Sequence, residues 1–395
     1  MTLTKKPVNG MKDILPEEMA VRNYVMGMIR ETYASFGFSS IETPAVEHIE
    51  NLLSKQGGDN EKLIFKILKR GEKLHIAEAT EEAEVTDSGL RYDLTLPLSR
   101  YYANHSSELP SPFKALQMGP VWRADRPQKG RYRQFTQCDI DILGEASPIA
   151  ETELILATST VISKLDFHNF TIRINDRRLL KDTAAAAGFS EEEYDSVFII
   201  LDKMDKIGHD GVIAELTEKF DEARAARYMD LFDKVEPAYD LPQIIENVTA
   251  LKTGDFKIAF DPTLVRGMSY YTGPIFEISV DEFGSSVGGG GRYDGMIGKF
   301  TGQPTPACGF SIGFERIIMI LMERGFKVPT GSGKTAFLIE KNMSPERMRE
   351  VLAEAMALRA QGQAVSVSVM KKNKKFQKDQ LLAEGYETIK EYFNG

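Results

Sequence analysis

The stretch that most constrains the fold is Trp122–Glu145, WRADRPQKGRYRQFTQCDIDILGE. Its first half is basic, with Arg123, Arg126, Lys129, Arg131 and Arg133, and its second half is acidic, with Asp139, Asp141 and Glu145. The strand-like patterns FKALQMGPVWRAD (113–125) and RQFTQCDIDILGE (133–145), joined by the polar RPQKG, predict an antiparallel pair with a long basic loop. Charges separated in this way favour a site that binds an anionic group at one end and a cationic group at the other.

Length and composition place the chain among globular proteins. With 395 residues it is too long for one compact core, so two or three domains are expected. No segment is apolar for long enough to span a bilayer, and the N-terminus lacks the apolar core of a secretory signal. The two cysteines, Cys138 and Cys308, argue against a disulfide framework, so a cytoplasmic location is expected.

Charge and histidine content limit the partners. A net charge of −9 argues against a protein that coats nucleic acid along its whole surface. Local basic segments remain at Arg123–Arg133 and at Lys371–Lys378 (KKNKKFQK), and the second is interpreted as a solvated surface. The five histidines form no cluster with metal-ligand spacing, whereas Mg²⁺ held by carboxylates and phosphates would leave no such pattern, so metal ligands stay unassigned.

The order of helical and strand patterns predicts an α+β fold. A helical pattern ends at Gly37, KLIFKIL (62–68) and LHIAEAT (74–80) alternate like a hairpin, and LRYDLTLPLSRYYANH (90–105) predicts a strand that turns into a helix after Pro97. Strands before residue 325 are mostly connected as hairpins, which predicts a mainly antiparallel sheet.

We predict three segments along the chain. Residues 1–325 form the main domain, with a helical insertion at about 177–253 that Asn175 and Asp176 begin as N-cap residues. A linker at 326–334 leads to a small βαβα unit at 335–395. The linker contains GSGKT, but Val328 stands where a P-loop requires its first glycine, so no P-loop is assigned.

The alternation of side chains along the second strand of the hairpin indicates which residues could bind a ligand together. Period-two spacing puts Arg131, Arg133 and Phe135 on one strand face, where a phosphate and a stacked base could bind; a solvated hairpin is the alternative. Gln137 and Asp141 continue that face and could hold an ammonium or an imidazole N–H. Alternatively, Asp139 and Asp141 pair with nearby arginines.

Later segments add three candidates. In LVRGMSYYTG (264–273), Arg266 could neutralise a phosphorus-centred transition state beside Tyr270 and Tyr271, or the segment is a tyrosine-rich core strand. Gly288–Gly291 would let the backbone approach a ligand, or would be a flexible loop. Arg316, at a strand-to-helix join, suits a terminal phosphate, or is a surface arginine.

Together these segments resemble the histidyl-tRNA synthetases, a family of class II aminoacyl-tRNA synthetases. FGFSSIETPAVE (36–47), GPVWRADRPQKGRYRQFTQCDIDILGE (119–145) and PACGFSIGFERI (306–317) are similar to class II motifs 1, 2 and 3. LVRGMSYYTGPIFE (264–277) and GGGGRYDGMIG (288–298) resemble two signatures particular to the histidine enzymes. The resemblance implies a six- to seven-stranded class II sheet flanked by helices, a helical insertion and a small C-terminal α/β domain.

The resemblance also implies roles for individual residues. Arg266 and Arg123 would be catalytic, with Arg266 stabilising charge at the α-phosphate. The residues implied to bind ATP are Arg123, Arg131, Phe135 and Arg316. The residues implied to bind histidine are Asp93, Thr95, Arg123, Gln137, Asp141, Arg266, Tyr270, Tyr271 and Tyr293.

The implied activity is that of a histidine–tRNA ligase, a homodimer that uses ATP, Mg²⁺, L-histidine and tRNA(His). Two features depart from the family pattern: Ser269 stands where an aspartate is usual, and the C-terminal domain is shortened. The shortened domain favours a rival, the non-catalytic regulatory subunit of ATP phosphoribosyltransferase, whereas the complete ATP site favours the enzyme. An aminoacylating paralogue with another acceptor is a third possibility.

Overall fold

The computed structural model describes residues 3–53, 60–128, 130–265, 270–280, 285–329 and 333–394. Lys129, Arg266 and Ser269, which the sequence singled out, lie outside the described residues. The chain divides into two compact units, Met1–Ile14 with Arg22–Arg324, and Leu15–Val21 with Gly325–Gly395.

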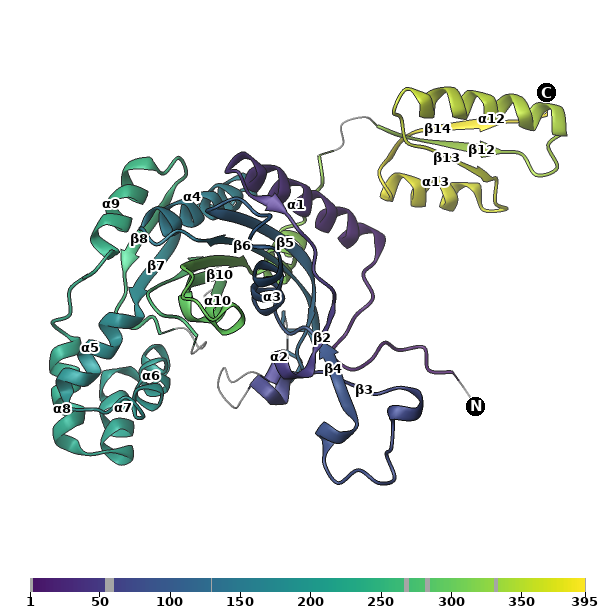
Figure 1. Ribbon diagram of the computed structural model, residues 1–395. Coiled ribbons are helices and arrows are strands. Elements are labelled where there is room, and N and C mark those ends of the chain that lie inside the picture. The colour runs from purple at the N-terminus through teal and green to yellow at the C-terminus, as the bar shows by residue number, and fades with distance from the viewer. Residues whose placement is uncertain are drawn as a thin grey trace. The chain divides into compact units, whose positions relative to one another are not determined.

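The larger unit is built on a curved sheet (Figure 1). Within the described residues it has eight strands, in the order β1-β5-β6-β11-β10-β9-β7-β8. Their bounds are β1 (Ser39–Ser40), β5 (Phe113–Trp122), β6 (Gln134–Leu143), β7 (Phe170–Asp176), β8 (Phe256–Phe260), β9 (Pro274–Val280), β10 (Ser285–Arg292) and β11 (Ala307–Ile312). The β1–β5 and β7–β8 pairs are parallel and the others antiparallel, which confirms the predicted α+β class, with a slightly higher strand count.

The predicted hairpin is the β5–β6 pair. Its register runs from Phe113 opposite Leu143 to Trp122 opposite Gln134. The second half of β6 is buried on both faces, from Cys138 to Leu143, because β5 and β11 flank it in the middle of the sheet. The turn therefore projects from one end of two long, central strands.

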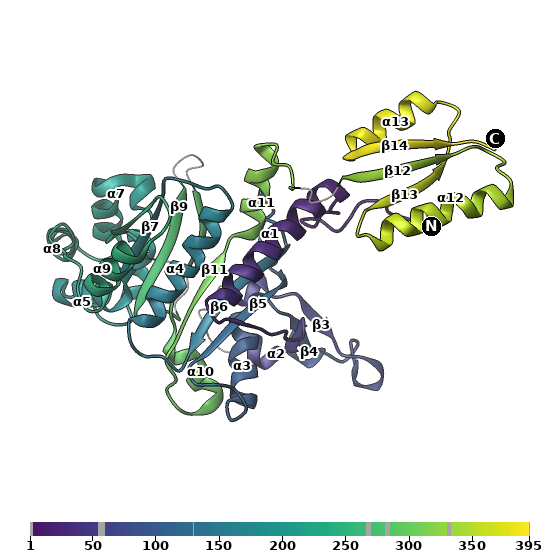
Figure 2. The ribbon, with the colours of Figure 1, turned by 90° about the horizontal axis from the view of Figure 1, so that it is seen from above.

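Helices cover both sides of this sheet. In Figure 1, α1 and α4 lie on its outer side, and α3 and α10 on its inner side; Figure 2 shows β7, β9, β11, β6 and β5 in that order across the sheet. Gly37, at φ +83°, follows the end of the first helix as predicted. The helix bounds are α1 (Pro16–Ser35), α2 (Ile49–Leu53), α3 (Thr95–His105), α4 (Ile149–Lys164), α10 (Asp294–Thr301) and α11 (Phe314–Glu323).

A second, smaller sheet replaces a predicted hairpin, and the helix that follows it begins earlier than predicted. The sheet consists of β2 (Val46–His48), β4 (Thr86–Leu90) and β3 (Lys66–Leu68), all antiparallel. The predicted hairpin between 62–68 and 74–80 is wrong, because β3 pairs with β4 and the intervening residues form turns and the short 3₁₀ helices η2 (Gly71–Lys73) and η3 (Glu82–Glu84). Helix α3 also begins before Pro97, since proline is tolerated in a first turn, where no intrahelical N–H bond is lost.

Helices occupy the chain between β7 and β8. They are α5 (Arg177–Ala187), α6 (Tyr194–Leu201), α7 (Met204–Lys219), α8 (Glu222–Phe232) and α9 (Leu241–Leu251). The predicted N-cap is confirmed at Asp176, whose side chain accepts a hydrogen bond from the Arg178 N–H at 2.8 Å. Figure 1 shows α5 to α8 grouped together, with α9 beside β8.

The smaller unit contains a three-stranded parallel sheet in the order β13-β12-β14. Its elements are β12 (Lys334–Ile339), α12 (Pro345–Ala360), β13 (Val365–Val369), α13 (Lys374–Ala383) and β14 (Tyr386–Tyr392). Figure 1 shows α12 and α13 on opposite faces of this sheet. The predicted βαβα order is present, but sequence analysis missed β14, whose mainly polar residues lie at the edge of the sheet.

Candidate functional site

A cavity of about 450 Å³ lies against β6, β10 and β11 of the large sheet. Of the predicted site residues, Arg266 lies outside the described residues, and the other eleven all line this cavity: Asp93, Thr95, Arg123, Arg131, Phe135, Gln137, Asp141, Tyr270, Tyr271, Tyr293 and Arg316. They come from segments far apart in the chain, so the fold brings them together.

Alternation along β6 supplies the floor of the cavity. Phe135, Gln137, Asp139 and Asp141 all line it, in agreement with the alternation that puts every second residue of a strand on the same face. The basic and acidic halves of the opening stretch are therefore the two ends of one site.

The acidic end contains buried carboxyl groups. Asp141 accepts a hydrogen bond from the Tyr293 hydroxyl at 2.5 Å, and burial raises the pKa of Asp141 to about 7 although this bond opposes the shift. Burial also raises the pKa of Asp93, and burial together with the neighbouring Asp141 raises that of Asp139 well above its usual range. This end of the cavity is suited to a cation that restores the charged forms.

Three buried oxygens at this end lack a hydrogen-bond partner among the described residues: Asp93 Oδ2, Gln137 Oε1 and Asp141 Oδ2. Neither Asp139 nor Asp141 forms an ion pair with an arginine in the part of the chain that the structure describes, so the predicted alternative of simple arginine pairing is wrong. Buried acceptors without partners are rare in proteins, and here they line an open cavity.

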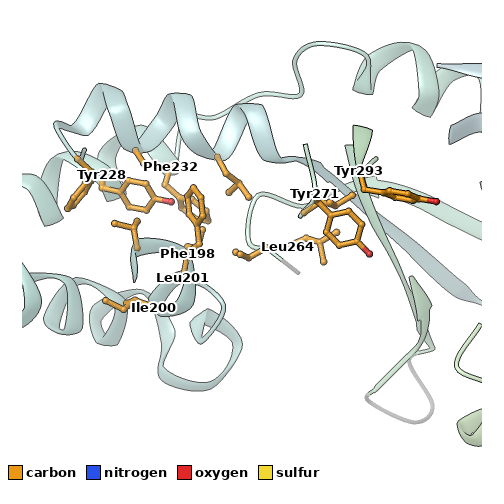
Figure 3. Close-up of a cluster of buried hydrophobic side chains, with 14 of the residues drawn as sticks. Phe198, Ile200, Leu201, Tyr228, Phe232, Leu264, Tyr271 and Tyr293 are labelled. Atoms are coloured by element: carbon orange, nitrogen blue, oxygen red, sulfur yellow. The ribbon is translucent and has the colours of Figure 1, made fainter. Parts of the chain in front are cut away.

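Tyrosine rings form the wall beside these carboxyl groups. The Tyr270 ring lies 4.7 Å from that of Tyr271 and 6.1 Å, edge-on, from that of Tyr293. Burial raises the pKa of Tyr270 and of Tyr293, so both hydroxyls are neutral hydrogen-bond donors. Figure 3 shows Tyr271 and Tyr293 at one end of a buried cluster that continues through Leu264 to Phe198, so the wall belongs to the hydrophobic core.

The basic end presents arginines that are already anchored. Arg123 donates from Nε to the Tyr92 carbonyl at 2.9 Å, and its guanidinium lies 5.2 Å from the centre of the Phe135 ring. Arg316 donates from Nη1 to the Ser286 carbonyl. Arg131 is more exposed, 60% for its side chain, and lies 3.4 Å from Asp125. Each of these arginines keeps further donors for an anionic ligand.

Arg133 does not share this face, so that prediction is wrong. Its Nε donates to the Asp125 carbonyl at 3.0 Å, and its backbone N–H donates to the Gly10 carbonyl at 2.7 Å. The reason is that β6 begins only at Gln134, so strand alternation does not extend back through 131–133.

Sequence analysis missed a buried ion pair behind the basic end. Arg22 on α1 donates to both carboxylate oxygens of Glu315, at 2.6 and 2.8 Å, and the Thr136 N–H donates to the same carboxylate at 3.0 Å. The pair connects α1 and β6 to the residue next to Arg316. Glu315 could have been found by its position in the quoted 306–317 segment, whereas nothing in the sequence marks Arg22.

The glycine run is a strand rather than a loop. Gly288–Gly291 belong to β10, paired with β9 and β11. A Cβ on Gly290 would lie 1.9 Å from the Gly309 carbonyl oxygen, and one on Gly309 would lie 2.0 Å from Asp141 Oδ1. Glycine is therefore needed for close strand packing and to leave room for the Asp141 carboxyl group.

The described residues contain no group of three or more His, Cys, Asp or Glu side chains arranged to hold a metal ion. They also contain no helix that is both long and apolar enough to cross a membrane.

Comparison with known proteins identifies the fold and the family. The model of the histidyl-tRNA synthetase family matches residues 10–317. A histidine–tRNA ligase from Leifsonia xyli is 43% identical, covering 97% of this chain and 94% of its own, and one from Korarchaeum cryptofilum is 36% identical, covering 94% and 87%. The crystal structure of histidyl-tRNA synthetase from Nostoc superposes with a TM-score of 0.78 at 28% identity, covering 98% of this chain and 91% of the other.

These matches, with the antiparallel sheet and the divided cavity, define the large unit as a class II aminoacyl-tRNA synthetase fold. Within that class, the chain belongs to the histidyl-tRNA synthetase family, as its sequence predicted.

Proposed function

We propose that this chain is a histidine–tRNA ligase, which activates L-histidine with ATP and transfers it to tRNA(His). The curated relatives that carry this name match nearly the whole chain. The observation that most directly supports the activity is the division of the cavity, with anchored arginines at one end and unpartnered buried acceptors at the other. ATP and the amino acid would meet between them.

Each end suits one substrate. At the basic end, Arg123, Arg131 and Arg316 would hold the triphosphate, and adenine would stack on Phe135. At the acidic end, Asp93, Thr95, Gln137 and Asp141 would hold the α-ammonium and neighbouring polar atoms, and Tyr270, Tyr271 and Tyr293 would surround the imidazole. Mg²⁺ would bind through the phosphates of ATP, where it would neutralise charge.

The chemistry would rest on positioning and charge neutralisation. The histidine carboxylate attacks the α-phosphorus, giving histidyl-adenylate and pyrophosphate. A terminal hydroxyl of the tRNA then attacks the acyl carbon of the adenylate, which forms the histidyl ester and releases AMP. Arg123, which is held by the Tyr92 carbonyl beside Phe135, would contact both reactants. We assign charge stabilisation at the α-phosphate to Arg266. Arg266→Ala should reduce adenylation steeply and leave histidine binding largely intact.

Histidine-dependent ATP–pyrophosphate exchange, followed by charging of tRNA(His), tests the proposal. Both reactions should be positive with the full chain. Absence of exchange would refute the enzyme assignment and favour the rival regulatory subunit. A solved structure from Bacillus halodurans is named for both functions. It has a TM-score of 0.79 but only 20% identity, so the similarity supports the fold and not either function. Exchange without charging would indicate a paralogue with another acceptor.

Assembly and domain roles extend the proposal. We propose a homodimer formed through the segment similar to motif 1 (36–47), to be tested by sedimentation. We also propose that 1–325 is the catalytic domain, with a helical insertion at about 177–253, and that 335–395, after a linker at 326–334, is an anticodon-binding-like α/β domain. A cytoplasmic location is supported by the buried free thiols of Cys138 and Cys308.

A further inference from the structure

Asp139 is a buried carboxyl group that the proposed roles leave unused. It lies on β6 between Gln137 and Asp141, is only 4% exposed, and lines the same cavity. Unlike Asp93 and Asp141, it has partners on both of its oxygens, so its contacts define a local structure rather than an open binding position.

Asp139, Ser311 and Gln137 form a closed ring of hydrogen bonds. The Ser311 hydroxyl donates to Asp139 Oδ1. Gln137 Nε2 donates to Asp139 Oδ2 at 3.2 Å and to Ser311 Oγ at 3.4 Å. Because a serine hydroxyl has one proton and here gives it to Asp139, Ser311 can only accept from Gln137.

This ring determines which way the Gln137 amide faces. Its NH₂ group lies against two acceptors, so its oxygen must be on the other side, and Gln137 Oε1 is one of the three buried acceptors without a partner among the described residues. With Asp139 charged, the reversed amide would put its carbonyl against the carboxylate, and two N–H donors would take the place of the unpartnered oxygen beside the cavity that Gln137 lines. Donors there would oppose an ammonium group.

We propose that Asp139 is a positioning residue that fixes the Gln137 amide with its oxygen toward the ligand, and so makes the acidic end select ligands that carry a primary ammonium group. The inference rests on the proposed histidine site and adds a determinant of its specificity. The glutamine supplies the contact, and Asp139 supplies its orientation.

Substitution of Asp139 by asparagine should reverse the orientation. In Asp139→Asn the Ser311 hydroxyl would donate to the new amide oxygen, which leaves the new NH₂ group facing Gln137. Two NH₂ groups cannot hydrogen-bond to each other, so the Gln137 amide would turn and present its own NH₂ to the cavity. The change should therefore affect the ammonium group of a ligand and not its imidazole.

Two analogues of histidine distinguish an effect on the ammonium group from an effect on the imidazole. Histamine keeps the ammonium and the imidazole but lacks the carboxylate, whereas 3-(imidazol-4-yl)propionate lacks the ammonium. Calorimetry on the full chain should show histidine and histamine binding weakened about 10- to 100-fold by Asp139→Asn, the range expected for a lost charge-assisted hydrogen bond. Binding of the propionate should change less than about twofold, which also verifies that the variant is folded.

A swapped pair tests orientation directly. In the double variant Gln137→Glu/Asp139→Asn, the carboxylate and amide exchange places, the charge is conserved, and an oxygen at position 137 again faces the cavity. Histamine binding should recover to within about fivefold of wild type. In a Gln137→Met background, Asp139→Asn should add at most about threefold, because there is no amide left to orient. Asp255→Asn, at an exposed position, is the matched control.

The outcomes distinguish this inference from the proposed function. Wild-type protein that binds neither histidine nor histamine overturns both. Wild-type protein that binds both, with Asp139→Asn unchanged or with equal losses for histamine and the propionate, overturns the positioning role alone. An undiminished effect of Asp139→Asn in the Gln137→Met background overturns it too, because Asp139 would then act through its charge.

Discussion

Glu315 and Asp141 are buried carboxyl groups that line the same cavity, yet their surroundings are opposite. Glu315 is held by both guanidinium nitrogens of Arg22 and by a backbone N–H. Asp141 is 3% exposed and accepts from one tyrosine hydroxyl, and its Oδ2 has no partner among the described residues. The carboxylate behind the basic end is thus satisfied without a ligand, whereas the acidic end has a buried acceptor with no partner among the described residues.

This difference indicates where binding energy is available. An ion pair that the protein satisfies by itself fixes geometry, and a ligand gains little from it directly. A buried carboxyl group with a raised pKa is unfavourable when charged, and a ligand cation that restores the charged form recovers that free energy. We therefore expect changes behind the basic end to alter stability, and changes at the acidic end to alter recognition.

The largest effect should follow from breaking the buried Arg22–Glu315 ion pair. Arg22→Met leaves Glu315 buried without its cation and should lower the free energy of unfolding by about 3–5 kcal/mol. Denaturant unfolding followed by fluorescence of Trp122, the single tryptophan of the chain, measures this in the larger unit. Arg22→Met/Glu315→Gln should recover most of the stability, because no uncompensated charge is then buried. No loss in the single variant would contradict the comparison.

Asp141→Asn should have the next largest effect, and on recognition instead. Removing one partner of a buried, charged contact costs about 2–5 kcal/mol, so kcat/KM for histidine in pyrophosphate exchange should fall about 100- to 1,000-fold. The KM for ATP should stay within about threefold. A comparable loss for both substrates would mean that the two ends are not separate.

The same variant has a pH signature in the ligand-free protein. Because the folded-state pKa of Asp141 is raised to about 7, its contribution to stability is greatest below the unfolded pKa, near 4, and is lost as pH rises through about 7. Asp141→Asn should thus be more stable than wild type at pH 8, by on the order of a few kcal/mol, and this advantage should disappear near pH 4. Thermal unfolding across this range, without histidine, measures the difference; an advantage that grew on acidification would be the wrong sign.

The parts of the site that lie on one hairpin could be predicted from local patterns in the sequence. The β5–β6 hairpin and the shared face of Phe135, Gln137 and Asp141 follow from strand alternation, which needs no knowledge of the rest of the chain. Local motifs also indicated Tyr270, Tyr271 and Arg316, whereas Asp93, Thr95 and Tyr293 came only from the resemblance to a family; all six line the cavity.

Long-range partners could not be predicted in this way. Arg22 and Glu315 are 293 positions apart, and an arginine on an amphipathic helix has the pattern of a solvated residue. The strand paired with β3 is TDSGL, in which Asp87 and Gly89 have low strand propensity, so the alternating LHIAEAT is the wrong prediction for the partner. The mainly polar β14 was missed for the same reason: tertiary pairing, not propensity, makes it a strand.

At the basic end, Arg316→Gln should have a moderate effect confined to ATP. The side chain is held by the Ser286 carbonyl but keeps donors for a phosphate, and a hydrogen bond to a charged group contributes about 1.5–3 kcal/mol. The KM for ATP should rise about 10- to 100-fold and the KM for histidine should not change. Arg227→Gln, on the exposed side of α8, is the control. A raised KM for histidine of the same size would place Arg316 at the wrong end.

The smallest effect should come from Phe135→Leu, which changes the surface for adenine without changing any charge. Leucine keeps most of the apolar area but loses the flat ring, so the loss should be about 0.5–1.5 kcal/mol, or a three- to tenfold rise in the KM for ATP. Arg123 loses a cation–π contact but keeps its bond to the Tyr92 carbonyl, so the KM for histidine should change less than twofold. Phe376→Leu, at a residue that is 56% exposed, is the matched control. A rise in both KM values would mean that the ring positions Arg123 for both substrates, and the two ends would then be coupled through Phe135.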